Sequence, residues 1–421
     1  MSYFENATPN QPSRIYLDNS ATTPLRPEVI QAIEPYLATL YGNPSSVHHF
    51  GRQSKAAVEI ARQKLANLLG AKPNEIYFTP SATYSNNVAL LGRARYVEQH
   101  NLGKHLITSA IEHASILGPV KFLESQGWKV TVLDADAEGF VDEQKLINAI
   151  TSETSIISIM WANNEIGTVQ SIERFAQIAK PRNIYFHTDA VQVVGKLRID
   201  VSKTPVDTLS LSGHKFHAPK GIGALYVRDG VQINPIMFGG GQEHGLFLGT
   251  EALTAIIAIG AAAEAANSKL DEMQVHLQKA QSIFADKFKL IPNVVFTGAA
   301  DLTKRVPGHL SVIVKGSLGE ELVEKADAFG ISVSSVSACS TNHPSHVLSN
   351  LGYSPDDVIA SVRISASTLN SLRDCEFAAE VLANIFAGGT GVNAPTKKVE
   401  QSNVIDFSLA ANLMRTISLS L

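Results

Sequence analysis

The sequence predicts an α/β fold with a mostly parallel central sheet, followed by a smaller α+β C-terminal domain. Over the first two thirds of the chain, short apolar runs alternate with longer helical patterns, which is typical of a parallel sheet. Most of these runs are continuously apolar or β-branched, as expected for strands covered on both faces. The length of 421 residues exceeds what one compact core holds, so we expect two domains.

The predicted strands of the first domain are short segments rich in Val, Ile and Leu: Glu75–Thr79, His105–Ser109, Lys129–Leu133, Ser155–Trp161, Ile184–His187, Thr208–Leu211 and Gly223–Val227. The helical patterns between several of them are Ser54–Leu69, Ser85–Gln99, Ile116–Gln126 and Ile172–Ala179. From Glu251 to Leu290 the chain is Ala-rich, and we expect a long helical link into the second domain. That domain is expected to hold strands Leu310–Val314 and Ile331–Ser334 and helices Glu320–Phe329 and Arg373–Phe386.

We expect the large domain to span residues 26–265 and the small domain to combine residues 1–25 with 266–390. The glycine-rich segment Ala387–Ala394 marks a break, and residues 391–421 form a tail with one further helical pattern, Val404–Leu419.

The composition excludes several function classes. A formal net charge of -4 gives no reason to expect nucleic acid or an anionic membrane as a partner. No apolar run has the length of a transmembrane helix, and the first residues lack a signal-peptide pattern. The two cysteines, Cys339 and Cys375, form neither a disulfide framework nor a four-cysteine metal site, so we expect a reducing, cytoplasmic environment and no metal.

A lysine follows one predicted strand after a small-residue turn, in the segment Ser212–Lys215. This placement suits a Schiff base with an aldehyde cofactor, although the segment alone is more typical of a solvated loop. Asp189 ends another predicted strand 26 residues earlier, where a carboxylate can keep a pyridinium nitrogen protonated; a lone Asp there is otherwise a helix cap. Gln192 follows and can donate to the cofactor's phenolic oxygen.

Polar residues follow three more predicted strands. Ser81 to Thr83 offers small residues and a hydroxyl at a helix N-terminus, which can cradle a phosphate or simply cap the helix. Asn163 and Asn164 stand at a strand's carboxyl end, where α/β proteins bind ligands. His113 has the same placement and can stack on a cofactor ring. Together these signals favour pyridoxal phosphate (PLP) chemistry over a structural role for each residue.

With these residues in place, the chain resembles the cysteine desulfurases of the NifS/IscS family, within the class V aminotransferases and PLP fold type I. The matching segments run from residue 16 to about 386 and keep their order and spacing. They are YLDNSATTP (16–24), YGNPSSVH (41–48), ITSAIEH (107–113), NNEIGTVQ (163–170), HTDAVQVVGK (187–196), SGHKFHAPKGIGALYVR (212–228), GGGQEHG (239–245), SVSACS (335–340), PSHVL (344–348) and SVRIS (361–365).

The resemblance implies a role for each matching residue. Lys215 would hold PLP and move the substrate's α-proton, Asp189 would bind the pyridine nitrogen, and His113 would stack on the ring. Arg363 would clamp the substrate carboxylate, a task suited to its planar fork. The further residues implied at the cofactor or substrate are Gln192, Asn164, Ala82, Thr83, Ser212, His214 and, across a dimer interface, Thr250.

The resemblance also implies the reaction. The thiolate of Cys339 would attack the sulfur of L-cysteine, leaving a persulfide on Cys339 and releasing alanine; His343 and His346 are nearby candidates for positive charge. The polar surroundings of Cys339 argue against a buried structural cysteine, whereas Cys375 lies in a helical pattern. A homodimer and a sulfur-acceptor protein are the implied partners, for iron–sulfur cluster assembly, tRNA thiolation or a specialised pathway.

Several positions depart from the family pattern. Ser81 and Tyr84 replace the usual Gly and Glu of the phosphate loop, and His244 and Phe247 replace two arginines. Val336 replaces a glycine, and the span from Cys339 to Pro344 is shorter than in housekeeping members. After Arg363 the usual Leu-Gly-Arg reads Ala366-Ser367-Thr368. Cationic groups are therefore lost near the expected mouth of the site, and we expect slow turnover without a partner.

Two alternatives stay open. The same scaffold serves other PLP enzymes, such as selenocysteine lyases, C–S lyases or aminotransferases, in which Cys339 would be dispensable. A degenerate paralogue could act as a partner or scaffold, but the intact Lys215, Asp189 and Arg363 argue against that role.

Overall fold

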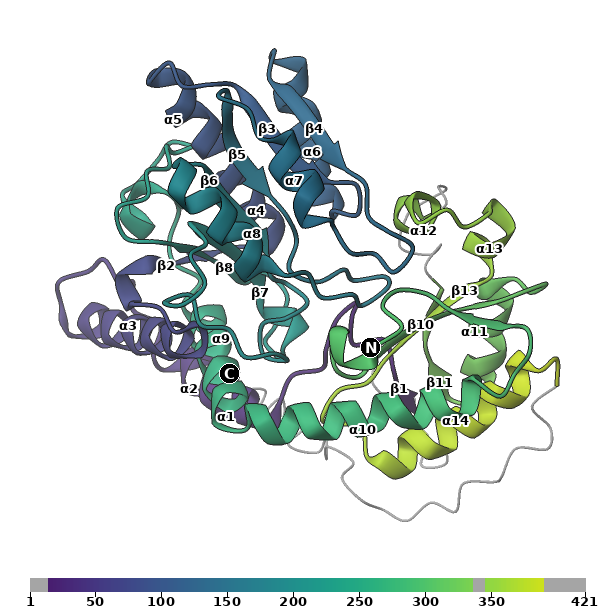
Figure 1. The fold of residues 1–421 in the computed structure, drawn as a ribbon. Coiled ribbons are helices and arrows are strands. Elements are labelled where there is room, and N and C mark those ends of the chain that lie inside the picture. Colours follow the sequence, from purple (N-terminus) through teal and green to yellow (C-terminus); the bar gives the residue numbers. More distant parts are fainter. Residues whose placement is uncertain (1–13, 336–344, 390–421) are drawn as a thin grey trace.

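The computed structural model describes residues 14–335 and 345–389, and its largest element is a seven-stranded sheet (Figure 1). The strand order is β2-β8-β7-β6-β5-β3-β4. Only β8 runs antiparallel to its neighbours, so the prediction of a mostly parallel sheet is confirmed. The strands are β2 (Ile76–Thr79), β3 (His105–Ser109), β4 (Lys129–Leu133), β5 (Thr154–Ser158), β6 (Tyr185–Asp189), β7 (Thr208–Ser212) and β8 (Gly223–Val227).

Both faces of this sheet are covered, because neighbouring residues along one strand pack into different cores. Ile107 and Ile157 belong to the largest buried cluster, which includes residues of α3 (His49–Leu69), α8 (Ile172–Ala179) and α9 (Leu253–Ser268). Leu106 and Ile156 belong to a second cluster, which includes residues of α5 (Arg93–Gln99) and α6 (Ala114–Ser125). Apolar residues on both faces explain why these strands read as continuous apolar runs.

The remaining α-helices among the described residues are α1 (Pro27–Ile33), α2 (Pro35–Ala38), α4 (Ala82–Asn87), α7 (Glu143–Ala149), α10 (Leu270–Phe288), α11 (Gly319–Ala328), α12 (His346–Asn350), α13 (Pro355–Ile359) and α14 (Leu372–Phe386). A π-helical turn, Val88–Gly92, joins α4 to α5. None of the described helices has both the length and the apolar character needed to cross a membrane.

The helical link between the two cores, predicted from Glu251 to Leu290, consists of two helices, α9 and α10. Lys269 leaves the helical region with φ of −129°, so that α9 ends there and α10 begins. The buried residues of α9 join the core of the large sheet, whereas Leu277 and Phe284 of α10 join a separate core. The break thus lets the chain pass from one core to the next.

The second core packs around a four-stranded antiparallel sheet of order β12-β13-β10-β9 (Figure 1). Its strands are β9 (Val294–Phe296), β10 (His309–Val314), β12 (Ser334–Ser335) and β13 (Ser361–Ser365). Near it, β1 (Ile15–Tyr16) pairs in parallel with β11 (Ile331–Ser332) and returns the start of the chain to this part of the molecule. The domain boundaries after residues 25 and 265 stay a prediction, and the helical pattern Val404–Leu419 lies outside the described residues.

A tight contact between α3 and α9 generates a prediction about stability. A Cβ on Gly260 of α9 would lie 2.6 Å from Cβ of Ala61, so Gly260→Ala should overpack the interface and cost about 1–3 kcal/mol of unfolding free energy. A Cβ on Gly118 of α6 would meet no atom within 4 Å apart from its chain neighbours, of which Pro119 disfavours a helical Ala before it. Gly118→Ala should therefore change the free energy of unfolding by less than about 1 kcal/mol. Urea unfolding of both variants measures the difference; an equal change in both would contradict the packing described here.

Candidate active site

A cavity of about 410 Å³ opens where several strands of the large sheet end at their carboxyl side. It is lined by most of the residues predicted from the sequence: Ala82, Thr83, His113, Asn164, Asp189, Gln192, Ser212, His214, Lys215 and Arg363. Thr250 lies elsewhere, against a smaller cavity of about 130 Å³ beside residues 242–252. Cys339 and His343 lie outside the described residues. Ten predicted residues therefore line one cavity: nine lie at or after strand ends of the large sheet, and Arg363 comes from the small sheet.

Asp189 at the end of β6 is buried and held by two donors. The side-chain amide of Asn86 donates to its Oδ2 at 2.8 Å, and the backbone N–H of Val191 donates to Oδ1 at 3.0 Å. Burial lowers the pKa of His187 to about 3, so its neutral ring bonds Asn86 Oδ1 at 3.0 Å through Nε2 and Thr208 at 2.9 Å through Nδ1. Because Nε2–H must donate to the amide oxygen, His187 turns the NH₂ group of Asn86 toward Asp189.

The corner with Ala82 and Thr83 is shaped by a helix start and a glycine. Ser81 is the N-cap of α4, and its Oγ accepts from the N–H of Tyr84 at 3.3 Å. On Gly223, a Cβ would lie 2.7 Å from the carbonyl oxygen of Leu211 and 3.0 Å from the backbone N of Ala82. Glycine at this point of β8 lets three backbones meet beside the cavity. Backbone N–H groups at a helix start favour an anion, as expected for a phosphate.

Hydrogen bonds hold two histidines that line the cavity. Nδ1 of His113 accepts from the N–H of Ser115 at 3.1 Å. Burial, with the nearby Lys215 and Lys220 cations, lowers the pKa of His214 to about 4. Its ring nitrogen lies 3.2 Å from Oγ1 of Thr22. A hydrogen bond to the start of α6 thus holds the ring of His113, and a contact with the segment after β1 holds the ring of His214.

Lys215 follows β7 and directs its amine to the segment after β1. Its Nζ donates to the carbonyl oxygens of Ser20 at 2.6 Å and Ala21 at 2.8 Å. Nε2 of Gln192 donates to the same oxygen of Ser20 at 3.1 Å. Two residues predicted to contact the cofactor therefore share one backbone acceptor.

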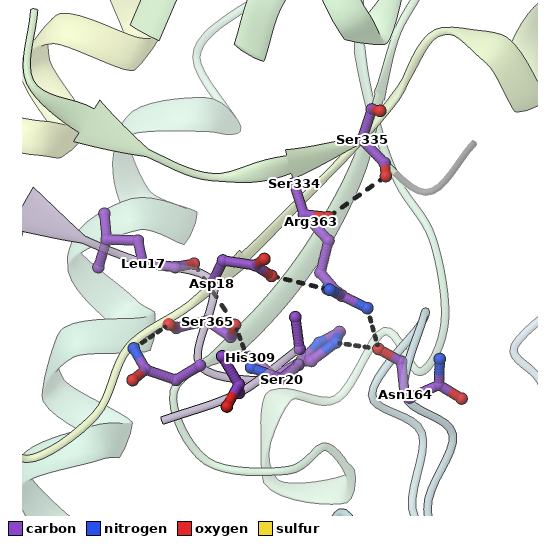
Figure 2. A network of polar contacts seen from close by, with 12 residues as sticks. Leu17, Asp18, Ser20, Asn164, His309, Ser334, Ser335, Arg363 and Ser365 are labelled. Atoms are coloured by element: carbon purple, nitrogen blue, oxygen red, sulfur yellow. Dashed lines mark hydrogen bonds and ion pairs between the residues drawn. The ribbon is translucent and has the colours of Figure 1, made fainter. Parts of the chain in front are cut away.

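Arg363 reaches the cavity from β13 of the small sheet (Figure 2). Its Nη2 lies 2.8 Å from Oδ1 of Asp18, and its Nη1 donates to the carbonyl oxygen of Asn164 at 3.1 Å. The side chain is only 1% exposed, and its Nε has no hydrogen-bond partner among the described residues. Contacts among the described residues therefore use two of the five guanidinium N–H groups, and the remaining N–H groups can donate to a carboxylate.

A buried histidine, His309, also contacts the carbonyl oxygen of Asn164. Nε2 of His309 on β10 lies 3.3 Å from the carbonyl oxygen of Asn164, while its Nδ1 has no partner in the part of the chain that the structure describes (Figure 2). Burial and the nearby cations Arg363 and Arg305 lower the pKa of His309 well below its usual range. A neutral His309 adds no positive charge beside Arg363, and Gly167, where a Cβ would lie 2.4 Å from Nδ1, leaves room for its ring.

The residues present fit PLP. A buried carboxylate, a lysine amine and a helix start lie around one cavity, as the pyridine nitrogen, aldehyde and phosphate of that cofactor require. Ser20, on the same lining, adds a buried hydroxyl that has no partner within residues 14–335 and 345–389. By contrast, the described residues hold no cluster of His, Cys, Asp and Glu suited to a metal ion.

Sequence reasoning missed Asn86, Asp18, Ser20 and His309 as parts of this site. Asp18 and Ser20 lie inside the matching segment YLDNSATTP, so that segment carried the signal. Asn86 lies in a predicted helix and His309 next to a predicted strand. Only the packing of the folded chain brings Asn86 to Asp189 and His309 to the carbonyl group beside Arg363. Cys375 is fully buried in α14, and burial raises the pKa of its thiol to about 12.

The geometry of Arg363 predicts how a substitution changes substrate binding. Arg363→Lys should weaken L-cysteine binding by about 1.5–3 kcal/mol, since an ammonium with three donors cannot bond Asp18 and Asn164 and also hold a substrate carboxylate at two points. Spectral titration with L-cysteine measures the dissociation constant, and cysteamine, which lacks the carboxylate, is the control ligand and should show little change. Equal losses for both ligands would show that Arg363 does not bind the carboxylate.

Comparison with known proteins places this architecture in a family. Residues 15–376 match the model of the class V aminotransferases. A cysteine desulfurase IscS of Methanosarcina thermophila is 43% identical over 88% of this chain and 91% of its own length. A cysteine desulfurase IscS of Dictyoglomus turgidum is 42% identical over 88% of this chain and 94% of its own.

Solved structures agree. A NifS-like protein superposes with a TM-score of 0.83 at 34% identity, covering 89% of this chain and all of its own. A structure described as SspA in complex with cysteine has a TM-score of 0.72 at 36% identity, covering 84% of this chain and 99% of its own. With the sheet, the cavity and these matches in agreement, the chain belongs to the class V aminotransferase family and, within it, to the NifS/IscS group of cysteine desulfurases.

Proposed function

We propose that this protein is a PLP-dependent cysteine desulfurase that converts L-cysteine to L-alanine and transfers the sulfur through a persulfide on Cys339. The main support for this proposal is that Asp189, Lys215 and Arg363 line one cavity. In this arrangement the carboxylate can bind a pyridine nitrogen and the amine can form a covalent link with an aldehyde. The guanidinium can bind the carboxylate of an amino acid. The similarity to cysteine desulfurases over most of the chain supports the choice of substrate.

We propose that the cofactor is held at three points. Lys215 provides the covalent attachment, Asp189 binds the pyridine nitrogen, and the backbone at Ala82 and Thr83 with Ser212 and His214 binds the phosphate. His113 stacks on the ring, and Gln192 donates to its phenolic oxygen. When bound, PLP supplies an electron sink for the α-carbon of an amino acid.

The protein's own groups then bind the substrate and move its proton. Arg363 and Asn164 orient the substrate, with the carboxylate on the unused donors of Arg363. The amine of Lys215 takes the α-proton. The thiolate of Cys339 attacks the substrate sulfur, and protonation of the remaining carbon skeleton releases alanine.

The ends of the segment that carries Cys339 are fixed near this site. Ser335 pairs with Val362 on β13, next to Arg363. At the other end, the hydroxyl of Ser345 donates to the buried carboxylate of Glu165, and the ring of His346 lies 3.0 Å from the carbonyl oxygen of Glu112. Glu165 and Glu112 follow strands β5 and β3 of the large sheet, whereas Ser335 lies on the small sheet beside Arg363. This supports the proposal that Cys339 serves the cavity.

We further propose a cytoplasmic homodimer that passes sulfur to an acceptor protein, with iron–sulfur cluster assembly as one pathway. Thr250 does not line the cavity of its own chain, which supports a role in the site of a second copy. Exposed apolar side chains support a contact surface: Tyr41 is 70% exposed, Val47 87% and Phe238 85%.

The persulfide separates a desulfurase from other PLP enzymes. Incubation with L-cysteine without reductant should add one sulfur mass to the peptide with Cys339 and none to the peptide with Cys375, whose thiol is buried and protonated. Cys339→Ala should keep the cofactor's visible absorption but lose nearly all alanine production. Peptide mass spectrometry and an alanine assay measure both. A fully active Cys339→Ala variant without persulfide would favour a lyase.

The shared site can be tested by mixing variants. Thr250→Glu would place a negative charge against the partner's phosphate, and Lys215→Ala removes the attachment point, so each homodimer should be inactive. Refolding the two together should restore up to about one quarter of the activity, because half of the dimers are then mixed and carry one intact site. Gln126→Glu, an exposed charge change elsewhere, is the control. No restoration would show that each chain uses its own Thr250.

A further inference from the structure

The turn formed by residues 18–21 lies between the two groups that act on the substrate. At one end Asp18 pairs with Arg363 at 2.8 Å, and at the other the carbonyl oxygens of Ser20 and Ala21 accept from Nζ of Lys215. This turn follows β1 and belongs neither to the strands of the large sheet nor to those of the small sheet.

A serine of the small sheet fixes the turn. The hydroxyl of Ser365 accepts from the N–H of Ser20 at 2.8 Å, and its carbonyl oxygen accepts from the side-chain amide of Asn19 at 2.8 Å (Figure 2). Both Ser365 and Ser20 are buried, at 3% and 2% exposure. These two contacts hold the side chain of Asn19 and the peptide unit between Asn19 and Ser20, which directly precedes the carbonyl group of Ser20.

The direction of these carbonyls matters for proton transfer. When the substrate's α-proton moves, its C–H bond breaks, a new N–H bond forms on Lys215, and the electron pair of the C–H bond passes to the cofactor. The lysine then carries a positive charge and three donors, with no acceptor of its own. Two carbonyl oxygens at 2.6 and 2.8 Å are suited to stabilise that ammonium.

We propose that Ser365 is a positioning residue for proton transfer at Lys215. Its hydroxyl holds Ser20, so that the carbonyl oxygens of Ser20 and Ala21 form an acceptor pair that stabilises the amine of Lys215 while it carries the α-proton. The inference rests on the proposed function, because it takes Lys215 as the base, but it does not depend on the sulfur chemistry of Cys339.

The test follows α-proton transfer without sulfur chemistry. The holoenzyme is incubated with saturating L-alanine in D₂O, and loss of the α-hydrogen signal is measured by NMR as a function of pH. Ser365→Ala should slow the exchange by about tenfold, the effect of weakening one hydrogen bond to a charged group. It should also move the ascending limb of the pH profile to lower pH, because the amine then holds its proton less tightly.

Matched variants separate this role from a general loss of structure. Ser365→Thr keeps the hydroxyl and should restore exchange, and Ser365→Cys, with a weak acceptor, should fall between. Ser361→Ala is the control, since Ser361 is a buried serine of the same strand whose hydroxyl donates to Val358 at 2.7 Å. It should match the wild type.

Three results would overturn the inference. In the first, Ser365→Ala keeps the wild-type rate and pH profile. In the second, Ser361→Ala loses as much as Ser365→Ala, which would indicate a general effect on the strand. In the third, the wild type exchanges no α-hydrogen, and then Lys215 is not the base and the proposed function fails with it. Exchange in the wild type without persulfide on Cys339 would contradict the desulfurase proposal alone.

Discussion

The site depends on one constraint of parallel sheets, which is that neighbouring strands running the same way end at the same edge. β6 ends at Asp189, and β7 pairs with it in parallel, with Asp189 opposite Ser210. The chain then needs only five more residues to reach Lys215. Strand pairing alone therefore brings the carboxylate and the amine to one cavity, although 26 residues separate them in sequence.

Near this edge of the sheet, burial keeps two ionisable side chains, His187 and Glu112, largely uncharged at neutral pH. The pKa of His187 is lowered to about 3 by burial, and its neutral ring orients Asn86 toward Asp189. A charged His187 would be a second cation beside the carboxylate and would compete with a pyridinium for it. Glu112 is also fully buried, and burial raises its pKa to about 8, so that its carboxyl group is largely protonated at neutral pH.

Among the described residues, Arg363 is the predicted site residue that comes from the small sheet, and its charge is balanced by Asp18. The turn that carries Asp18 also touches Lys215, so the carboxylate-binding group and the base are connected through one short segment. A shift of the small sheet relative to the large one would move both contacts together. The geometry at the substrate thus depends on both sheets.

The sequence predicted the large sheet well because its strands are buried on both faces and read as apolar runs. It did not predict β9 and β13, which are short strands outside the first domain, nor the break at Lys269, which lies inside an uninterrupted helical pattern. Site residues that follow strands were predictable from position and from the resemblance. Asn86, Ser365 and His309 were not, because their contacts arise between elements far apart in sequence, and a buried Asn, Ser or His has no local signature.

The central claim is that Lys215, and not another amine, holds the cofactor. Lys196 is the rival, since burial and the cations Lys215 and Arg363 lower its pKa to about 7, and it donates to Gln192 at 3.4 Å. Reducing the holoenzyme with borohydride makes the covalent link permanent, and mass spectrometry of its peptides locates the added mass. We expect the cofactor mass only on the peptide that contains Lys215. The same mass on the peptide that contains Lys196, or on no lysine, would contradict it.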